Sequence, residues 1–163
     1  KLLEYGMGEP CLIHEPGRYL VCDAGVLLTS VASIKDGYKR FIGVDAGMNT
    51  LIRPAMYRSY HHILPANDLN AALDSKVNVV GQVCENTDQL AADRALPAGI
   101  KVGDVLAILN AGAYGFGMSS QYNSRPRAAE VLVRNGRAEL IRKREEFADL
   151  VRGVRVPKAW SEW

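Results

Sequence analysis

The sequence EVLVRNGRAELI, residues 130–141, is the stretch that most directly indicates how this chain folds. Runs rich in Val, Leu and Ile stand on either side of Asn135-Gly136. An Asn-Gly pair between two such runs is typical of a two-residue hairpin turn, because both turn residues must adopt positive φ. We therefore predict an antiparallel hairpin over these residues.

Five other segments have the apolar, β-branched composition of short strands. Gly25 separates the first two of them and predicts a bulge or bend. Asp36-Gly37 is a hairpin-type turn that leads into the third. The expected strands are Tyr19–Cys22, Val26–Val31, Phe41–Asp45, Asn78–Val83 and Val105–Leu109.

Three short segments favour helix instead. The apolar spacing from Pro54 to Leu64 suits a helix with Pro54 in its first turn. Thr87-Asp88 could cap a helical turn that runs through Ala95, and Glu145–Val151 places acids at a helix N-terminus. With five to seven short strands and two or three small helices, the chain is expected to be mainly β. A Greek-key-like barrel or sandwich fits better than a βαβ array.

Composition limits the kind of protein this is. With 163 residues, 48% of them hydrophobic, the chain suits one domain with a real core. A net charge of +2 excludes a protein built mainly to neutralise phosphates, so no nucleic-acid partner is expected. The longest apolar run, residues 19–34, is too short and too polar for a membrane span, and residues 1–8 lack a signal-peptide core. We expect a cytoplasmic protein with no membrane partner.

The cysteines and histidines give no metal or disulfide pattern. Cys11, Cys22 and Cys84 are an odd set without a CxxC pair, so we expect reduced thiols, two of them filling the core. His61 and His62 are adjacent and would point about 100° apart on a helix, and His14 stands alone. No metal site is predicted.

Two segments could recognise anionic or ring-containing ligands. Glu15-Pro16-Gly17-Arg18 brackets a tight turn with a carboxylate and a guanidinium, which could face a ring nitrogen and an anion. A turn with a surface ion pair is the simpler alternative. Arg53 and Tyr57 are four residues apart, so they share one face if the segment is helical. There the guanidinium could form two parallel hydrogen bonds with a ligand carboxylate, and the tyrosine hydroxyl could donate another. The alternative is an exposed arginine and a half-buried tyrosine.

Two further segments could contribute chemistry. Cys84-Glu85 follows an apolar strand, where a thiol could act as a proton donor or nucleophile; a buried, inert cysteine is the alternative. Gly112-Ala113-Tyr114-Gly115-Phe116-Gly117 lacks the context of a phosphate-binding loop. Its glycines do indicate a close approach of the backbone to something near Tyr114.

In order and spacing, these segments resemble the C-terminal β domain of the fold-type III pyridoxal-phosphate decarboxylases, and in particular of the diaminopimelate decarboxylase family. Four matching stretches carry the resemblance and cover most of the chain. They are HEPGRYLVCDAGVLLTSV (14–31), GVDAGMNTLIRPAMYRSYHHI (43–63), VVGQVCENTD (79–88) and GDVLAILNAGAYGFGMSSQYNSRPRAAEVLV (103–133).

The resemblance implies roles for the turn and for Tyr114. Glu15 would face the pyridine nitrogen of pyridoxal 5'-phosphate and favour its protonated form. The remaining turn residues, Pro16, Gly17 and Arg18, would border the cofactor, and Arg18 would also reach the substrate. Tyr114 would lie against both cofactor and substrate.

The resemblance also implies a substrate and an acid. Arg53 and Tyr57 would hold a distal substrate carboxylate, which favours diaminopimelate over the amine-ended substrates of ornithine-type relatives. Cys84 would return a proton to the carbon that loses carbon dioxide, and Glu85 would bind a substrate amine, both in the neighbouring subunit's site. The usual C-E-S-G-D motif is C-E-N-T-D here, Cys84 to Asp88.

Members of this family also have an N-terminal TIM-type barrel that supplies the Schiff-base lysine and the phosphate loop. None of the lysines lies in the family's lysine context: Lys1, Lys35, Lys39, Lys76, Lys101, Lys143 and Lys158. We expect residues 1–18 to be the tail end of that absent barrel, 19–151 the β domain and 152–163 a C-terminal tail.

The implied function is decarboxylation of meso-2,6-diaminopimelate to L-lysine, with this chain supplying half a site and inactive alone. The implied partners are the enzyme's own barrel domain and a second copy in a homodimer with shared active sites. Two alternatives stay open. One is a sister decarboxylase for ornithine, lysine or a carrier-bound amino acid, and the other is a non-catalytic binding domain.

Overall fold

A computed structural model describes residues 3–157 and Trp160, so Lys1, Lys158 and part of the predicted tail 152–163 lie outside the described residues. Six strands of this described part form one sheet: β1 (Leu27–Asp36), β2 (Arg40–Val44), β3 (Ile63–Pro65), β4 (Ser75–Val80), β5 (Gln89–Leu96) and β6 (Val105–Ile108). A separate hairpin follows, formed by β7 (Glu130–Arg134) and β8 (Arg137–Arg142). The helices are short: η1 (Leu3–Tyr5), α1 (Gly17–Val21), α2 (Arg53–Tyr57), η2 (Phe116–Met118), η3 (Tyr122–Ser124) and α3 (Phe147–Leu150).

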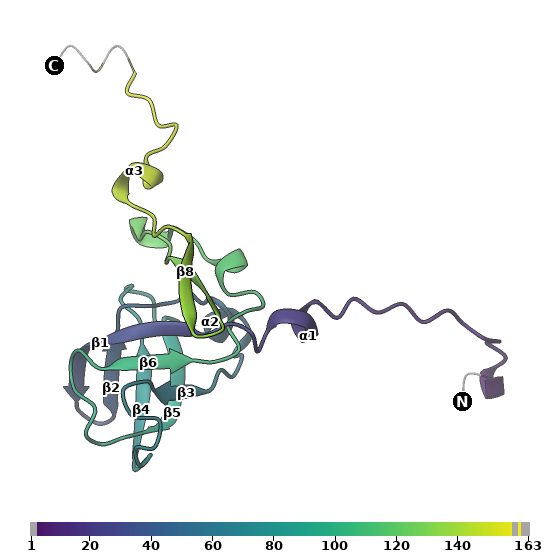
Figure 1. Cartoon of the computed structure of the whole chain (residues 1–163), viewed down its shortest axis with the longest axis horizontal. Coiled ribbons are helices and arrows are strands. Elements are labelled where there is room, and N and C mark those ends of the chain that lie inside the picture. Colours follow the sequence, from purple (N-terminus) through teal and green to yellow (C-terminus); the bar gives the residue numbers. More distant parts are fainter. Residues whose placement is uncertain (1–2, 158–159, 161–163) are drawn as a thin grey trace.

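The six strands curl into a nearly closed barrel (Figure 1). Their order is β3-β6-β1-β2-β4-β5, and the edge strands β3 and β5 contact each other. All neighbours pair antiparallel except β2 and β4, which run parallel. Because β6 lies between β3 and β1, strands that are far apart in the sequence are neighbours in the sheet. The predicted mainly β, Greek-key-like fold is confirmed.

The interior of the barrel is aliphatic. Every strand of the sheet contributes side chains that are almost completely buried, and burial of such groups stabilises the fold by roughly 1.5–3 kcal/mol each. The most completely buried aliphatic side chains are Ile42, Leu51, Ile63, Leu96, Leu106 and Ile108, with Val31, Val44, Val77 and Val79. Asn78 is also buried, and its Oδ1 accepts hydrogen bonds from Gln89 Nε2 (3.3 Å) and Asp93 N (3.1 Å).

The predicted hairpin is confirmed and forms a two-stranded sheet of its own (β8 is labelled in Figure 1). Asn135 and Gly136 have φ of 50° and 72°, as its two-residue turn requires. Most of its side chains are exposed, including the apolar Val133 and Ile141. At the base of the hairpin, Glu145 accepts hydrogen bonds from the main chain and side chain of Arg127.

The expected strand at Tyr19–Cys22 is wrong, because residues 19–21 belong to helix α1 and Cys22 caps it. The amide of Cys22 donates to the carbonyl of Arg18 (3.0 Å), which closes a helical turn, and neither sheet of the described residues includes this segment. Tyr19 and Leu20 are exposed, so their apolar character buries nothing within the described chain. Gly25 precedes β1 and lies against Gly112, where a Cβ on either residue would overlap the other's backbone.

Two expected helices also differ. Helix α2 has Pro54 in its first turn, as predicted, but ends at Tyr57 because Arg58 adopts a left-handed φ of 53°. Ile63–Pro65 is instead strand β3. The helical turn expected from Thr87-Asp88 through Ala95 is wrong: Gln89–Leu96 is strand β5, paired with β4, and buries Leu90 and Leu96. The C-terminal helix is confirmed in shorter form as α3, with Glu146 in a capping box.

Candidate active site

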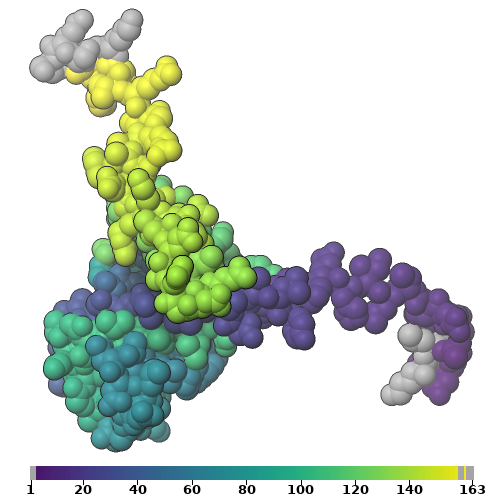
Figure 2. Space-filling model, in the orientation of Figure 1, coloured from purple at the N-terminus to yellow at the C-terminus, as the bar shows by residue number. Residues whose placement is uncertain are grey.

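The turn Glu15-Pro16-Gly17-Arg18 leads directly into α1. Gly17 N donates to Glu15 O (2.9 Å), and Tyr19 N donates to Pro16 O (3.0 Å), so two consecutive tight turns fix the segment. Glu15 is exposed at the end of the extended N-terminal arm, which projects from the barrel in Figure 2. Arg18 is half-buried, and its Nη1 donates to Sγ of Cys22 (3.4 Å), the residue that follows α1.

Tyr114 joins this turn to helix α2. Its ring lies 5.3 Å from the guanidinium carbon of Arg18 and 5.4 Å from that of Arg53. Arg53 also lies 5.1 Å from the ring of Tyr57, which confirms that these two residues share one face of α2. Residues from three distant parts of the chain thus form one cationic–aromatic cluster, which we call the arginine–tyrosine cluster: Arg18, Arg53, Tyr57 and Tyr114.

The backbone around Tyr114 is tightly constrained. Tyr114 has a φ of 59°, a left-handed conformation that a bulky residue adopts only when its surroundings hold it there. Gly112 precedes it and packs so closely on Val21 O that a Cβ would overlap that oxygen. The close backbone approach predicted from the glycines is confirmed. It fixes an aromatic ring that remains 46% exposed.

Arg53 has unsatisfied hydrogen-bonding capacity. Its Nη2 donates to Ser59 Oγ (3.2 Å), but its buried Nε has no partner within the described residues. A guanidinium with free donors beside two tyrosine rings is suited to a carboxylate, which can accept two parallel N–H bonds.

His61 lies near Arg53, although the sequence did not assign it to the site. It is 1% exposed and its Nδ1 donates to Leu109 O (2.9 Å), because a carbonyl can only accept. Burial lowers the pKa of His61, the Leu109 bond partly opposes this, and the charges of Arg53, Arg18 and Arg94 lower it further. The imidazole of His61 is therefore neutral at pH 7. That His61 and His62 bind no metal remains a prediction.

Cys84 and Glu85 lie elsewhere, on the loop between β4 and β5. Both are exposed. Tyr122 Oη donates a hydrogen bond to Glu85 Oε1, and Asn123 Nδ2 lies 3.9 Å from Cys84 Sγ. The bond to Glu85 raises the pKa of Tyr122, so its hydroxyl stays protonated. Among the described residues, these two side chains contact the η3 segment rather than the arginine–tyrosine cluster.

The cysteines are free, as predicted, but none fills the core. Cys11 and Cys84 are exposed and Cys22 is half-buried. Tyr122 and Asn123 were missed because nothing in the local sequence links them to residues some 37 positions away. No helix in the described part of the chain is long and apolar enough to cross a bilayer.

Comparison with known proteins identifies the class. Residues 18–112 match the family model for the C-terminal sheet domain of pyridoxal-dependent decarboxylases. This match covers more than half of the chain and includes Arg18, Arg53, Tyr57, Cys84 and Glu85. The chain therefore belongs to this family of C-terminal sheet domains.

Similar proteins narrow the relationship. A diaminopimelate decarboxylase of Methanothermobacter thermautotrophicus is 60% identical over 157 residues, which is 96% of this chain and 36% of the relative. The diaminopimelate decarboxylase structure from M. jannaschii has a TM-score of 0.84 at 43% identity, covering 97% of this chain and 36% of that one. A Helicobacter pylori diaminopimelate decarboxylase complexed with L-lysine has a TM-score of 0.77 at 43% identity, covering 85% of this chain and 34% of that one. The chain spans about a third of the length of these relatives.

Proposed function

We propose that this chain is the substrate-binding and dimerisation part of a diaminopimelate decarboxylase, which converts meso-2,6-diaminopimelate to L-lysine and carbon dioxide. The observation that carries the proposal is Arg53, whose unpaired Nε is buried beside Tyr57 and Tyr114. A guanidinium held there suits a substrate with a second carboxylate. The names of the most similar relatives support the same substrate.

The residues present fit one side of a pyridoxal 5'-phosphate site. Gly17 leaves a narrow space against Tyr114, since a Cβ there would lie 3.1 Å from the tyrosine oxygen. Glu15, Pro16, Gly17, Arg18 and Tyr114 would border the cofactor on this side. When bound, the cofactor withdraws electrons from the substrate carbon, and the Glu15 carboxylate would favour protonation of its ring nitrogen.

Each remaining site residue acts on the substrate. Arg53 and Tyr57 would bind the distal carboxylate, and Arg18 would add positive charge next to Tyr114. Glu85 would bind the distal amine. Cys84 would donate its thiol proton to the carbon that has lost carbon dioxide.

The separation of Cys84 and Glu85 from the arginine–tyrosine cluster supports a homodimer with shared sites. Both residues are exposed on the β4–β5 loop, where a second copy could receive them. We further propose that the enzyme's own N-terminal barrel completes the site with its lysine and phosphate loop. In this proposal residues 1–18 are the tail end of the barrel domain, 19–151 form the β domain and 152–163 form a tail. The free cysteines are compatible with a cytoplasmic enzyme.

Carbon dioxide release from meso-diaminopimelate tests this proposal, with the chain alone and then mixed with a separately expressed barrel half. We expect no carbon dioxide release from the chain alone and release after mixing, because the barrel supplies the lysine. Activity of the chain alone would contradict the half-site assignment. Folded, paired halves that use ornithine or lysine instead would favour a sister decarboxylase, and halves inactive on all three would favour a non-catalytic domain.

A further inference from the structure

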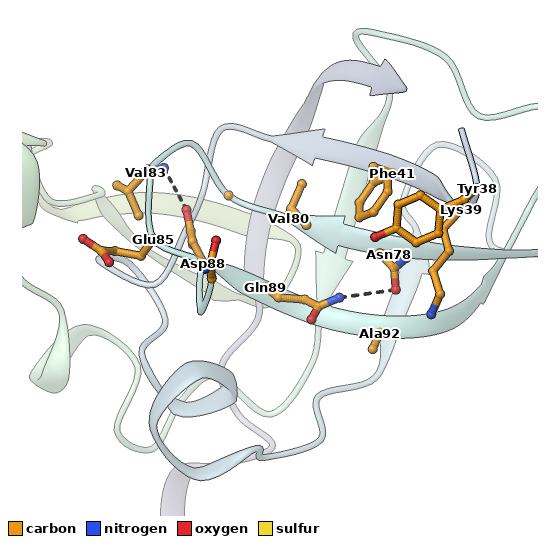
Figure 3. Close-up of a pocket in the computed structure, with 12 residues that line it drawn as sticks. Tyr38, Lys39, Phe41, Asn78, Val80, Val83, Glu85, Asp88, Gln89 and Ala92 are labelled. Atoms are coloured by element: carbon orange, nitrogen blue, oxygen red, sulfur yellow. Dashed lines mark hydrogen bonds between the residues drawn. The ribbon is translucent and has the colours of Figure 1, made fainter. Parts of the chain in front are cut away.

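Asp88 is a buried carboxylate that binds main-chain amides on two separate segments. It is 4% exposed. Its Oδ1 accepts a hydrogen bond from Met48 N (2.6 Å), and its Oδ2 accepts one from Val83 N (2.8 Å), the bond drawn beside Asp88 in Figure 3. Hydrogen bonds to a charged acceptor are stronger than neutral ones, so each amide is firmly held.

Two glycines make room for this carboxylate. A Cβ at Gly47 would lie 2.9 Å from Asp88 Oδ1, and a Cβ at Gly81 would overlap both carboxylate oxygens. The backbone therefore encloses the carboxylate from two sides. A side chain larger than hydrogen at Gly47 or Gly81 would therefore push the carboxylate off its two donors.

The main chain of Asp88 closes the same loop. Gly81 N donates to Asp88 O (2.9 Å), and Asp88 N donates to Glu85 O (3.0 Å). Cys84 and Glu85 lie inside the span that these bonds close, and in Figure 3 Glu85 points away from the enclosed carboxylate. Cys84 and Glu85 thus lie on a loop that Asp88 holds from the inside, while Tyr122 and Asn123 contact it from the outside.

The Met48 bond connects this loop to the arginine–tyrosine cluster. Thr50 N and Leu51 N both donate to Gly47 O (2.9 and 3.0 Å), which makes residues 47–51 a rigid turn. Helix α2, with Arg53, begins two residues later. Asp88 therefore joins the segment that presents the thiol and carboxylate to the segment that presents the guanidinium.

We propose that Asp88 is a positioning residue that fixes the Cys84–Glu85 loop against the turn preceding Arg53. Its catalytic meaning rests on the proposed function, whereas its effect on the loop does not. A carboxylate is required because both of its oxygens face N–H donors. An asparagine would place an NH₂ group against one of those amides, and a buried unmatched donor is costly.

The test is Asp88→Asn in the complete enzyme, with hydrogen exchange of residues 82–87 and alkylation of Cys84 as readouts that need no activity. We expect exchange in the loop and alkylation to accelerate about tenfold or more, with β4 and β5 unchanged. The turnover number should fall about tenfold or more, because the proton donor is no longer held. Asp104→Asn is the control, since Asp104 Oδ2 also accepts a main-chain bond, from Lys101 N (2.9 Å), but on the turn before β6.

A second variant approaches the same carboxylate from the other side. Gly81→Ala keeps the charge of Asp88 and displaces it, so it should loosen the loop in the same way. Loop exchange and Cys84 alkylation within twofold of wild type in both variants would overturn the proposal, as would a loosened loop with unchanged turnover. A wild-type enzyme inactive on diaminopimelate would refute the proposed function, while the exchange result would still decide the role of Asp88 in the loop.

Discussion

The hydroxyl of Tyr122 donates a hydrogen bond to Oε1 of Glu85, so the carboxylate that we assign to the substrate amine is held by a phenol from η3. Because the bond raises the pKa of Tyr122, the phenol remains a donor throughout the neutral range. This contact orients an otherwise exposed side chain that would lose rotamer freedom on binding a ligand.

We expect Tyr122→Phe to raise KM for diaminopimelate about three- to tenfold, with a smaller change in kcat, because Glu85 must then be ordered by the substrate itself. Steady-state kinetics of the complete enzyme measures this. Tyr60→Phe is the control, since the Tyr60 hydroxyl pairs with His62 Nδ1 (3.1 Å) rather than with a site carboxylate. An unchanged KM in Tyr122→Phe would remove Tyr122 from the site.

Gly17→Ala tests the contact between the N-terminal turn and Tyr114. The added methyl group would lie 3.1 Å from the tyrosine oxygen, so the hydroxyl end of the ring must move slightly away from the turn. We expect weaker binding of pyridoxal 5'-phosphate by about fivefold or more. Cofactor titration followed by absorbance measures it. Gly99→Ala is the control, because a Cβ there meets nothing within 4 Å. Equal cofactor affinities in the two variants would contradict the assignment of Gly17 and Tyr114 to the cofactor site.

The sequence predicted the elements whose signal is local. Asn135-Gly136 determines its hairpin, and the four-residue spacing of Arg53 and Tyr57 placed them correctly on one face. Gln89–Leu96 was assigned wrongly because Gln, Leu, Ala and Arg favour helix in isolation, whereas pairing with β4 and burial of Leu90 decide in favour of strand.

The site was predictable only in part for the same reason. The residues of the arginine–tyrosine cluster were singled out by motif, but their assembly depends on long-range contacts such as Gly112 against Val21. The partners of Cys84 and Glu85, Tyr122 and Asn123, lie in a stretch that carried the resemblance but to which it assigned no role at these positions. The expectation of two core cysteines failed because loop position, rather than side-chain polarity, keeps Cys11 and Cys84 at the surface.

Arg53 should determine substrate choice. We expect Arg53→Ala to lower kcat/KM for diaminopimelate by roughly 10- to 150-fold, the loss for a charge-assisted hydrogen bond worth about 1.5–3 kcal/mol. Cofactor affinity should change much less. Arg53→Lys should recover only part of the loss, because an ammonium group cannot form the paired contact.

The control for this experiment is Arg94→Lys, since Arg94 is also half-buried over an aromatic ring, 4.0 Å from the centroid of Tyr60. Competition between diaminopimelate and a substrate without a distal carboxylate measures the discrimination directly. If Arg53→Ala leaves kcat/KM for diaminopimelate unchanged, the distal carboxylate is bound elsewhere.

His61 should make the stability of the chain depend on pH. Burial holds the pKa of His61 below its usual 6.5 in the folded chain, so between the two pKa values the unfolded state binds a proton that the folded state does not. The free energy of unfolding contributed by His61 is therefore fully present above pH 6.5 and is lost as the pH falls below that value. One proton gives a slope of at most about 1.4 kcal/mol per pH unit.

Urea unfolding of the chain between pH 5 and 8 measures this slope. His61→Asn should flatten it, because the amide can still donate to Leu109 O but does not titrate in this range. It should also lower stability at pH 8 by roughly 1–2 kcal/mol through the lost ring volume. His62→Asn should keep the wild-type slope, since His62 is less buried and pairs with the exposed Tyr60. A slope that survives in His61→Asn and disappears in His62→Asn would show that the buried imidazole is not the group that senses pH.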